Sequence, residues 1–581
     1  MELHQLVAES IADTKASLWP AFGPELILCA TILVMLLVKL IPGLRKLDAF
    51  LIVLIGSLAA LYFAFPLKHF GSSDPLPRCE LFTGMLVYDA FTVYMRAFLV
   101  FFAVLFALFT RISGIPDRAD AVDFYCMVLG AIVGMCLMVS ANHLLVVFLA
   151  VEMASVPSYA LAAMLKGRRE SSEAALKYSI YGAGAAGVML YGISLLAGIL
   201  GSAHFPTMAA ELSQRLPELS PQETMVLVLG GLMTTVGLAF KLSAVPFHFW
   251  CPDVFEGASA EVNAFLSVAS KGAALALLVR VSLGLGMTHA EVAGPPTPEI
   301  QTQHAISTAS GALAAPEAAL MAVADESLVS SDADHVDTFT FRDSGTDVRH
   351  FIGLVIALLA AVTCTFGNLA AYGQTNIKRL LAYSTIAHAG YMMLPIPAAL
   401  ELAGVDPPAA KAAIASLALY MGIYLFMNLG AFAIVAFLRN TLGSEEIADY
   451  SGLVRQSPGV AICLATILFS LVGIPPLAGF VGKFAIFASL AEGYVSTGQV
   501  YLIVLLILGG LNTVISLFYY LRVIKVMTFE SGEDRAPATP YRMLSSLAGL
   551  YTALVTAPLI LLFVSWESLN NWTQAAMQNL F

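Results

Sequence analysis

The sequence predicts an all-α protein that crosses a membrane about fourteen times, and this prediction rests on its composition and its apolar runs. Of the 581 residues, 59% are hydrophobic and only 12% are charged, and the mean hydropathy is +0.82. A water-soluble domain is about half apolar and about a quarter charged, because its surface needs a polar coat. We therefore expect a polytopic membrane protein rather than a soluble enzyme.

The composition also excludes several other classes of protein. The seven cysteines contain no C-x-x-C pair, which argues against an iron–sulfur or zinc cluster and against a disulfide framework. A net charge of −11 and a pI near 5.4 argue against nucleic-acid binding. No basic segment with a cleavage site precedes the first apolar run, so we expect no signal peptide.

Fourteen segments approach the roughly 20 apolar residues that a helix needs to cross a bilayer. They lie near residues 24–42, 48–66, 89–110, 123–140, 142–165, 174–201, 224–246, 261–287, 351–372, 380–398, 413–438, 459–489, 500–527 and 545–566. With the N-terminus outside, 15 of the 29 Lys and Arg residues fall in inside loops and 7 in outside segments. Because Lys and Arg favour cytoplasmic loops, we expect both termini outside and an even number of spans.

Two spans contain prolines close to a lysine, and they suggest an internal repeat. Pro246 follows Lys241 in the seventh span, and Pro475 and Pro476 precede Lys483 in the twelfth. Proline breaks a helix, and transporters place ion sites at broken helices. The seventh and twelfth spans are five apart, and because five is odd they cross the membrane in opposite directions. This is the arrangement of an inverted repeat of five helices. The predicted parts are 1–122 (helices 1–3), 123–287 (first half, helices 4–8), 288–350 (insert), 351–527 (second half, helices 9–13) and 528–581 (helix 14 and tail).

The segment 288–350 differs from the rest of the chain. It is rich in Ala, Ser, Thr and Asp and has no long apolar run. We expect an acidic, mobile external insert, either a dispensable loop or a loop that binds a partner.

Five ionisable residues within the spans are the candidate functional residues. Each charge inside a bilayer costs about 3 kcal/mol or more and so needs a reason. Burial disfavours a charged lysine and a nearby carboxylate favours it, so moving the carboxylate would make the lysine release its proton. We expect a proton relay, although a lysine near a span end, such as Lys177, could simply reach the interface, and Glu152 could be a static partner. The five residues are Glu152, Lys177, Lys241, Lys271 and Lys483.

Two histidines are secondary candidates for the same relay. His248 lies just past Pro246, and His388 lies in "LLAYSTIAHAGYMML". Histidine titrates near neutral pH and is suited to proton transfer, but each could equally be a hydrogen-bonded packing residue. Asn428 and Asn512 are expected to bind water or to join helices.

Four motifs make the chain resemble subunit N of respiratory NADH-quinone oxidoreductase (complex I), one of its antiporter-like membrane subunits. They are "AVPFHFWCPDVFEGA" (244–258), "KRLLAYSTIAHAGYM" (378–392), "NLGAF" (428–432) and "GIPPLAGFVGKF" (473–484). The resemblance covers nearly the whole chain except the insert and the termini. Lys483, where sister subunit M usually has glutamate, favours N, and the absence of a long lateral C-terminal helix disfavours subunit L.

The resemblance implies where each step of the activity takes place. The family's proton-path residues fall on the five ionisable residues named above. Protons would enter from the inside through Lys241 toward Lys271 and leave outside through Lys483. NADH oxidation, FMN, iron–sulfur clusters and the quinone site would lie in other subunits, so we expect no cofactor and no metal in this chain. Its partners would be other membrane subunits, both antiporter-like and small connecting ones, within the lipid of a bacterial inner membrane.

The sequence departs from the family in one region, and three other functions stay open. Residues 258–263 read "ASAEVN", with Glu261 in place of a proline-rich stretch, and Ser270 replaces a common proline. The alternatives are a cation/proton antiporter subunit, a subunit of a ferredoxin- or hydrogenase-linked relative of complex I, and a scaffold that moves no protons.

Overall fold

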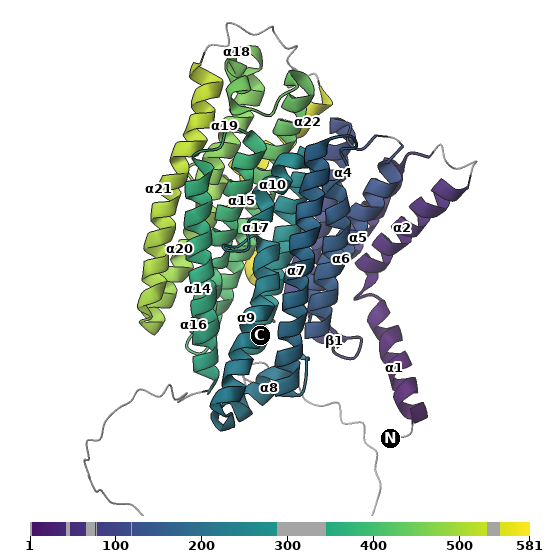
Figure 1. Ribbon diagram of the computed structural model, residues 1–581, viewed down its shortest axis with the longest axis vertical. Helices are drawn as coiled ribbons and strands as arrows, with labels where there is room; N and C mark the ends of the chain where they lie inside the picture. Colours follow the sequence, from purple (N-terminus) through teal and green to yellow (C-terminus); the bar gives the residue numbers. More distant parts are fainter. Residues whose placement is uncertain are drawn as a thin grey trace, which may run out of the picture.

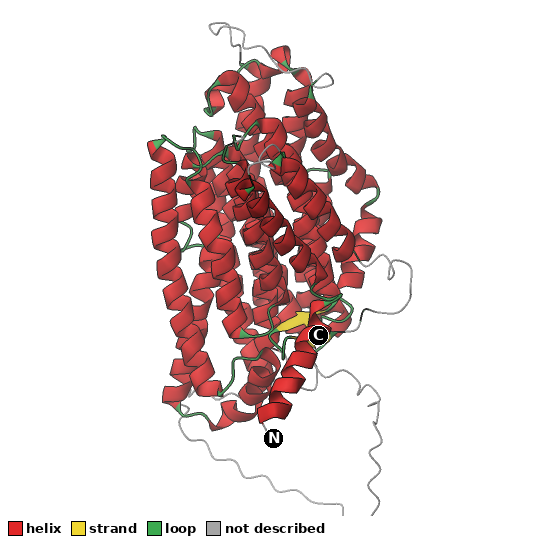
Figure 2. Cartoon of the chain, turned by 90° about the vertical axis from the view of Figure 1, so that its right-hand side faces the viewer, coloured by secondary structure: helices red, strands yellow, loops and turns green. Residues whose placement is uncertain are grey.

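The computed structural model describes residues 3–41, 47–65, 76, 78–117, 119–286, 344–530 and 546–580, and most of them lie in helices that run side by side (Figures 1 and 2). In chain order the elements are α1 Leu3–Leu18, α2 Gly23–Leu40, α3 Ala49–Ala64, β1 Cys79–Leu81, β2 Leu86–Tyr88, α4 Ala90–Ser113, α5 Ala121–Ser140, α6 Leu144–Ala162, α7 Arg169–Leu200, α8 Phe205–Arg215, α9 Pro221–Leu242, α10 Trp250–Gly257, α11 Ala260–Phe265, α12 Lys271–Gly286, α14 Ser344–Ala371, α15 Ile377–Met393, α16 Pro395–Leu402, α17 Pro407–Leu442, α18 Leu453–Gln456, α19 Pro458–Val472, α20 Ala478–Thr497, α21 Val500–Phe529, α22 Leu547–Val564 and α23 Trp566–Ala576. A π-helical turn, Leu266–Ser270, joins α11 to α12, and 3-10 turns lie at Leu216–Glu218 and Ile447–Tyr450.

The predicted class, an all-α membrane protein, is confirmed, but the count of fourteen spans is not. Among the described residues, twelve helices are long and apolar enough to cross a bilayer, and α11 with α12 counts as one of them. The helices α3 and α19 are apolar but only 16 and 15 residues long. The predicted span 380–398 is divided between α15 and α16, which meet at Leu394.

Both predicted breaks are present, and one is more complete than expected. The helix α9 ends at Leu242, and α10 begins at Trp250, beyond Pro246. The predicted single span 459–489 is in fact two helices, α19 and α20, separated by residues 473–477. The physical reason is local, because Gly473 takes a left-handed φ of +90° and Pro475 and Pro476 supply no backbone N–H.

The two ends of the described chain lie at the same end of the bundle. Figure 1 shows α1, α8 and β1 at this end and α18 at the opposite end. The backbone N–H of Thr83 donates to Asp13 Oδ2 of α1 at 2.7 Å, and Arg78 donates to the carbonyl of Leu580 at 3.2 Å. The hairpin of β1 and β2 therefore contacts both terminal segments, which agrees with an even number of crossings.

The predicted insert falls mostly outside the described residues. Residues 287–343 are not described, whereas 344–350 form the first turns of α14, which begins at Ser344. The expected boundary at 350 is therefore wrong by several residues. The reason is that the helix extends through the polar residues that precede its apolar part.

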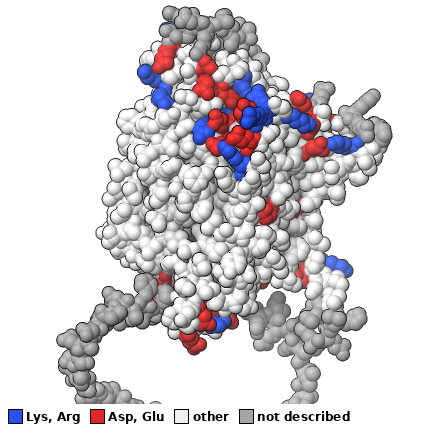
Figure 3. All heavy atoms as spheres, viewed as in Figure 1, with Lys and Arg blue, Asp and Glu red and all other residues white. Residues whose placement is uncertain are grey.

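Charged side chains gather toward the ends of the bundle and leave its flank apolar. On the face drawn in Figure 3, most Lys, Arg, Asp and Glu atoms lie toward the α18 end, a smaller group lies at the opposite end, and the flank between them is nearly uncharged. A nearly uncharged flank between two charged ends is suited to the hydrocarbon core of a membrane.

One buried ion pair attaches the N-terminal helices to the rest of the bundle, and a second joins two of these helices to each other. Arg280 of α12 binds both carboxylate oxygens of Asp89 at 2.6 and 2.7 Å, and Arg96 of α4 lies 2.6 Å from Glu25 of α2. All four side chains are almost inaccessible to solvent. Two arginines within predicted spans therefore have structural partners in this chain.

Candidate functional site

Lys241 lies at the first break and is buried in the bundle. It is in the last turn of α9, and its ammonium makes no hydrogen bond with any described residue. The carboxylate of Glu152, on α6, is close enough to interact with it electrostatically. Glu152 itself is only half-buried by this chain. The structure thus brings together the predicted pair Glu152 and Lys241, with the carboxylate near the surface of the bundle.

Lys271 connects the first broken helix to the second half of the chain. It is buried where the π-helical turn meets α12, and its Nζ donates to the carbonyl of Leu242 at 3.1 Å and to that of Thr385 at 3.3 Å. Leu242 ends α9, so its carbonyl is one of those that an intrahelical N–H does not satisfy. The negative end of a helix dipole also favours a cation at this place.

His388 lies between Lys271 and Lys483. Its ring is buried, Nδ1 is hydrogen-bonded to the hydroxyl of Tyr420 at 2.7 Å, and Nε2 is hydrogen-bonded to that of Tyr520 at 3.2 Å. Both lysines affect it electrostatically. Because each ring nitrogen has a hydroxyl partner, His388 can accept a proton on one side and donate one on the other.

Lys483 repeats the arrangement of Lys271 at the second break. It is buried in the second turn of α20, and its Nζ donates at 3.0 Å to the carbonyl of Val472, which ends α19. The ammonium also lies 4.3 Å from the centre of the Tyr391 ring, in a cation–π contact. In both halves, therefore, a lysine binds the last carbonyl of a helix that ends inside the bundle.

Lys177 lies in a different environment from the other four residues. Its Nζ is 2.8 Å from Asp253 of α10 and 2.9 Å from Glu173, and its side chain is 36% exposed. Asp253 also accepts from Arg379 of α15 at 3.0 Å. The carboxylate partners of Lys177 among the described residues are thus Asp253 and Glu173. Its role in a relay stays a prediction.

His248 is buried against aromatic rings. The ring centres of Phe249 and Phe366 lie 4.5 and 4.4 Å from its own. It is near enough to Lys271 to interact electrostatically. This packing fits the alternative of a structural histidine, and a part in the relay stays a prediction.

Sequence reasoning missed Tyr420, Tyr424 and Tyr520 around His388, whereas Asn428 was expected to bind water or to join helices. Tyr520 also binds Ser384, and Asn428 donates to the Tyr424 hydroxyl at 2.8 Å and to Thr385 Oγ1 at 3.3 Å. The signal for the missed residues was a tyrosine deep within an apolar span, where a polar tip needs a partner. Asn512 joins helices as expected, since it accepts from Asn368 and donates to Thr365.

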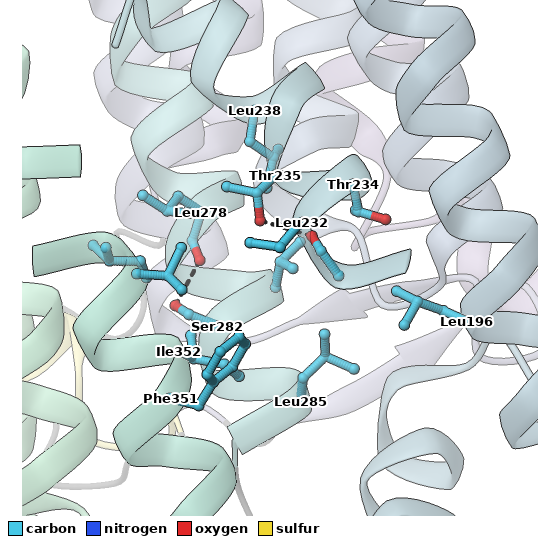
Figure 4. Close-up of a pocket in the computed structure, with 14 residues that line it drawn as sticks. Leu196, Leu232, Thr234, Thr235, Leu238, Leu278, Ser282, Leu285, Phe351 and Ile352 are labelled. Atoms are coloured by element: carbon cyan, nitrogen blue, oxygen red, sulfur yellow. Dashed lines mark hydrogen bonds between the residues drawn. The ribbon is translucent and has the colours of Figure 1, made fainter. Parts of the chain in front are cut away.

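An apolar cavity of about 70 Å³ lies between α9, α12 and α14 (Figure 4). Its polar lining groups are the hydroxyls of Thr234, Thr235 and Ser282, and each donates to a carbonyl of its own helix. The cavity therefore presents no free donor and lies apart from the relay residues. Within the described part of the chain, no group of three His, Cys, Asp or Glu residues is placed to hold a metal ion.

Comparison with known proteins places this architecture in a family. A bundle with two helices broken inside the membrane is the architecture of ion-translocating membrane proteins. The family model described as "NADH:quinone oxidoreductase/Mrp antiporter, TM" matches residues 141–293 and 339–516. NADH-quinone oxidoreductase subunit N of Anaeromyxobacter sp. (strain Fw109-5) is 36% identical over 572 residues, covering 97% of each chain. The protein belongs to the family of NADH-quinone oxidoreductase subunit N.

Two solved structures share its fold. A chain of respiratory complex I from Thermus thermophilus, solved with bound aureothin, has a TM-score of 0.63 and 25% identity, over 94% of this chain and 98% of that one. A chain of the Mrp complex from Dietzia sp. DQ12-45-1b has a TM-score of 0.68 and 16% identity, over 98% and 97%. Both belong to multi-subunit membrane complexes, and the protein is a membrane subunit of such a complex.

Proposed function

We propose that the chain carries protons across the membrane through Glu152, Lys241, Lys271, His388 and Lys483, as a subunit of an NADH-quinone oxidoreductase. The observation that carries this proposal is the position of Lys271. It binds the carbonyl that ends α9 and the carbonyl of Thr385 on α15, three residues before His388. A single ammonium thus joins the broken helix of the first half to the helix of the second half that carries His388.

The side chains can pass a proton without any other reacting group. A lysine that loses its proton becomes an acceptor, and a tyrosine hydroxyl can accept and donate at the same time. A proton leaving Lys271 can thus reach His388 and then Lys483 through the Tyr420 and Tyr520 hydroxyls or through water beside them. Glu152 controls the first step, the loading of Lys241 with a proton, because the negative charge of Glu152 favours the charged form of Lys241.

The half-buried position of Glu152 supports a neighbour at this face. A carboxylate facing lipid near the middle of a bilayer is costly, so another protein chain should cover it. The exposed apolar residues beside it on α6 are Leu145, Leu149, Met153 and Val156. We place an adjacent membrane subunit of the complex here. NADH oxidation, with FMN, the iron–sulfur clusters and quinone, belongs to other subunits.

The orientation of the chain in the membrane is inferred from the positive-inside rule. Lys and Arg are more frequent in the loops of the side opposite the termini. We therefore place both termini on the outer face of a bacterial inner membrane. Protons then enter the first half from the inside toward Lys271 and leave outside through Lys483.

Replacing Lys241 by alanine in the assembled complex tests the proposal. We expect NADH-to-quinone turnover and proton pumping to fall together while assembly stays intact, because the first half then lacks its buried proton carrier. The matched control is Lys166→Ala, which removes a lysine that is 72% exposed and paired with Asp120 at the surface. Normal turnover and pumping in the Lys241 variant would favour a scaffold. Pumping that requires Na⁺ would favour a cation/proton antiporter.

A further inference from the structure

Four ionisable residues outside the relay form a second cluster near the α18 end of the bundle. Arg439 of α17 donates to Glu261 of α11 at 3.2 Å, and Lys378 of α15 lies 2.8 Å from Glu445, just before the 3-10 turn Ile447–Tyr450. Lys378 also donates to the carbonyl of Ala258 at 2.8 Å and interacts electrostatically with Glu261 and Arg439. We refer to Glu261, Lys378, Arg439 and Glu445 as the Glu261 cluster.

The Glu261 cluster is largely buried in the bundle. Glu261 is completely buried, and Lys378 is 2% exposed. The Oε2 atom of Glu261 has no hydrogen-bond partner among the described residues. A buried carboxylate oxygen without a donor needs a reason, since such oxygens are nearly always satisfied. A proton held on Oε2 would remove the charge from that oxygen, so this carboxylate is suited to bind and release one.

Two helices lead from the Glu261 cluster to Lys271. Glu261 and Lys271 lie ten residues apart on the span formed by α11, the π-helical turn and α12, which is about 15 Å along a helix axis. Lys378 precedes Thr385 by seven residues on α15, and Thr385 is the residue whose carbonyl binds Lys271. The helices that carry Glu261 and Lys378 therefore meet at the same ammonium.

The interval between Glu261 and Lys271 contains buried polar groups. Asn263, Ser267 and Ser270 lie in it, all buried, and Asn263 Oδ1 has no hydrogen-bond partner among the described residues. The turn Leu266–Ser270 is π-helical, a geometry that is frequent at functional sites. At the other end of the cluster, the side chain of Glu445 is 16% exposed, and its Oε1 is buried without a hydrogen-bond partner among the described residues. The polar groups thus extend from the surface toward Lys271.

We propose that Glu261 is a proton-loading residue that supplies Lys271 from the α18 end of the molecule. Glu445 takes a proton from water, the proton passes along the cluster to Glu261 Oε2, and Glu261 then gives it to the neutral amine of Lys271 through the polar groups or water between them. Only O–H and N–H bonds form and break, Glu261 returns to its charged form, and nothing is oxidised or reduced. The inference rests on the proposed function.

The experiment compares three variants in the assembled complex, namely Glu261→Gln, Arg439→Gln and the double variant. Glutamine keeps the shape of Glu261 but cannot carry the proton. We expect Glu261→Gln to lower pumping and coupled turnover roughly tenfold, since general acid–base groups contribute at least this much. The double variant removes both charges and leaves no unpaired arginine. It should assemble normally and stay as impaired as Glu261→Gln.

Two outcomes would overturn the inference. The first is wild-type pumping in Glu261→Gln. The second is recovery of pumping in the double variant, which would mean that Glu261 only neutralises Arg439. Lys271→Ala, measured in the same membranes, separates the two proposals. Lost pumping in Lys271→Ala beside normal pumping in Glu261→Gln rejects only the loading role, whereas normal pumping in Lys271→Ala rejects the relay itself.

Discussion

Individual side chains in this bundle take their roles from the partners that surround them. Lys241 and Lys177 are both lysines of predicted spans. Lys241 is buried, and its ammonium makes no hydrogen bond with any described residue. Lys177, by contrast, pairs with two carboxylates and is partly exposed to solvent. His388 has a hydroxyl on each ring nitrogen, whereas His248 is packed against phenylalanine rings. Residue type therefore identifies candidates for a relay, and surroundings separate them.

Replacing His388 by glutamine should impair proton transfer without unfolding the bundle. Glutamine can still hydrogen-bond the hydroxyls of Tyr420 and Tyr520, but it cannot hold an additional proton near neutral pH. We expect pumping and coupled turnover of the assembled complex to fall by about tenfold or more. His143→Gln is the control, because His143 caps α6 away from the relay. Wild-type pumping in the His388→Gln variant would show that His388 takes no part in proton transfer and serves only in packing.

At the scale of elements, the two broken helices decide where the lysines can bind. A continuous helix satisfies its own carbonyls, so the breaks after Leu242 and Val472 supply the acceptors that Lys271 and Lys483 use. Gly473 makes the second break possible. Its φ is +90°, and a Cβ atom placed there would lie only 3.0 Å from Cδ of Lys483.

Replacing Gly473 by alanine should therefore have two separable effects. Any L-residue at this φ costs about 1–3 kcal/mol of stability. The new methyl group should also displace Lys483 from the Val472 carbonyl and lower proton pumping. Gly498→Ala is the matched control, because Gly498 ends α20 with a φ of +72° and has no neighbouring atom within 4 Å. Thermal stability should fall in both variants and pumping only in the first, so equal pumping in the two would contradict the argument.

At the scale of the whole molecule, buried ion pairs hold together segments that are distant in sequence. Asp89 caps α4 and accepts two hydrogen bonds from Arg280 of α12, whose guanidinium also donates to Val139 and Thr92. The contacts of Arg280 with Asp89, Val139 and Thr92 therefore connect the N-terminal helices to α12, the helix that begins at Lys271.

Replacing Asp89 by asparagine should destabilise the protein strongly. The substitution keeps the shape of the side chain but leaves a buried guanidinium without its counter-charge, which typically costs about 3–5 kcal/mol. We expect a clearly lower temperature of thermal unfolding for the purified complex. Asp123→Asn, which removes an exposed partner of Lys39, should cost about 1 kcal/mol or less. Equal unfolding temperatures for the two variants would contradict this account.

The sequence by itself determined the class of fold, most spans, both breaks and the identity of the candidate residues. These features depend on local properties, namely the length of apolar runs, the missing N–H of proline and the cost of a charge in lipid. The same properties were too local to predict that the second break divides the span into two separate helices, α19 and α20, or that α14 begins at Ser344.

Only the tertiary structure decided which residues meet. Glu25 with Arg96, Asp89 with Arg280 and Glu261 with Arg439 join residues that are 71 to 191 positions apart, and no local pattern predicts such pairs. The same holds for the tyrosines around His388, which come from α17 and α21. A side chain deep in a bundle must find its partner on another helix, because its own helix satisfies only its own backbone. Packing of helices, rather than the sequence of any one of them, therefore brings these residues together.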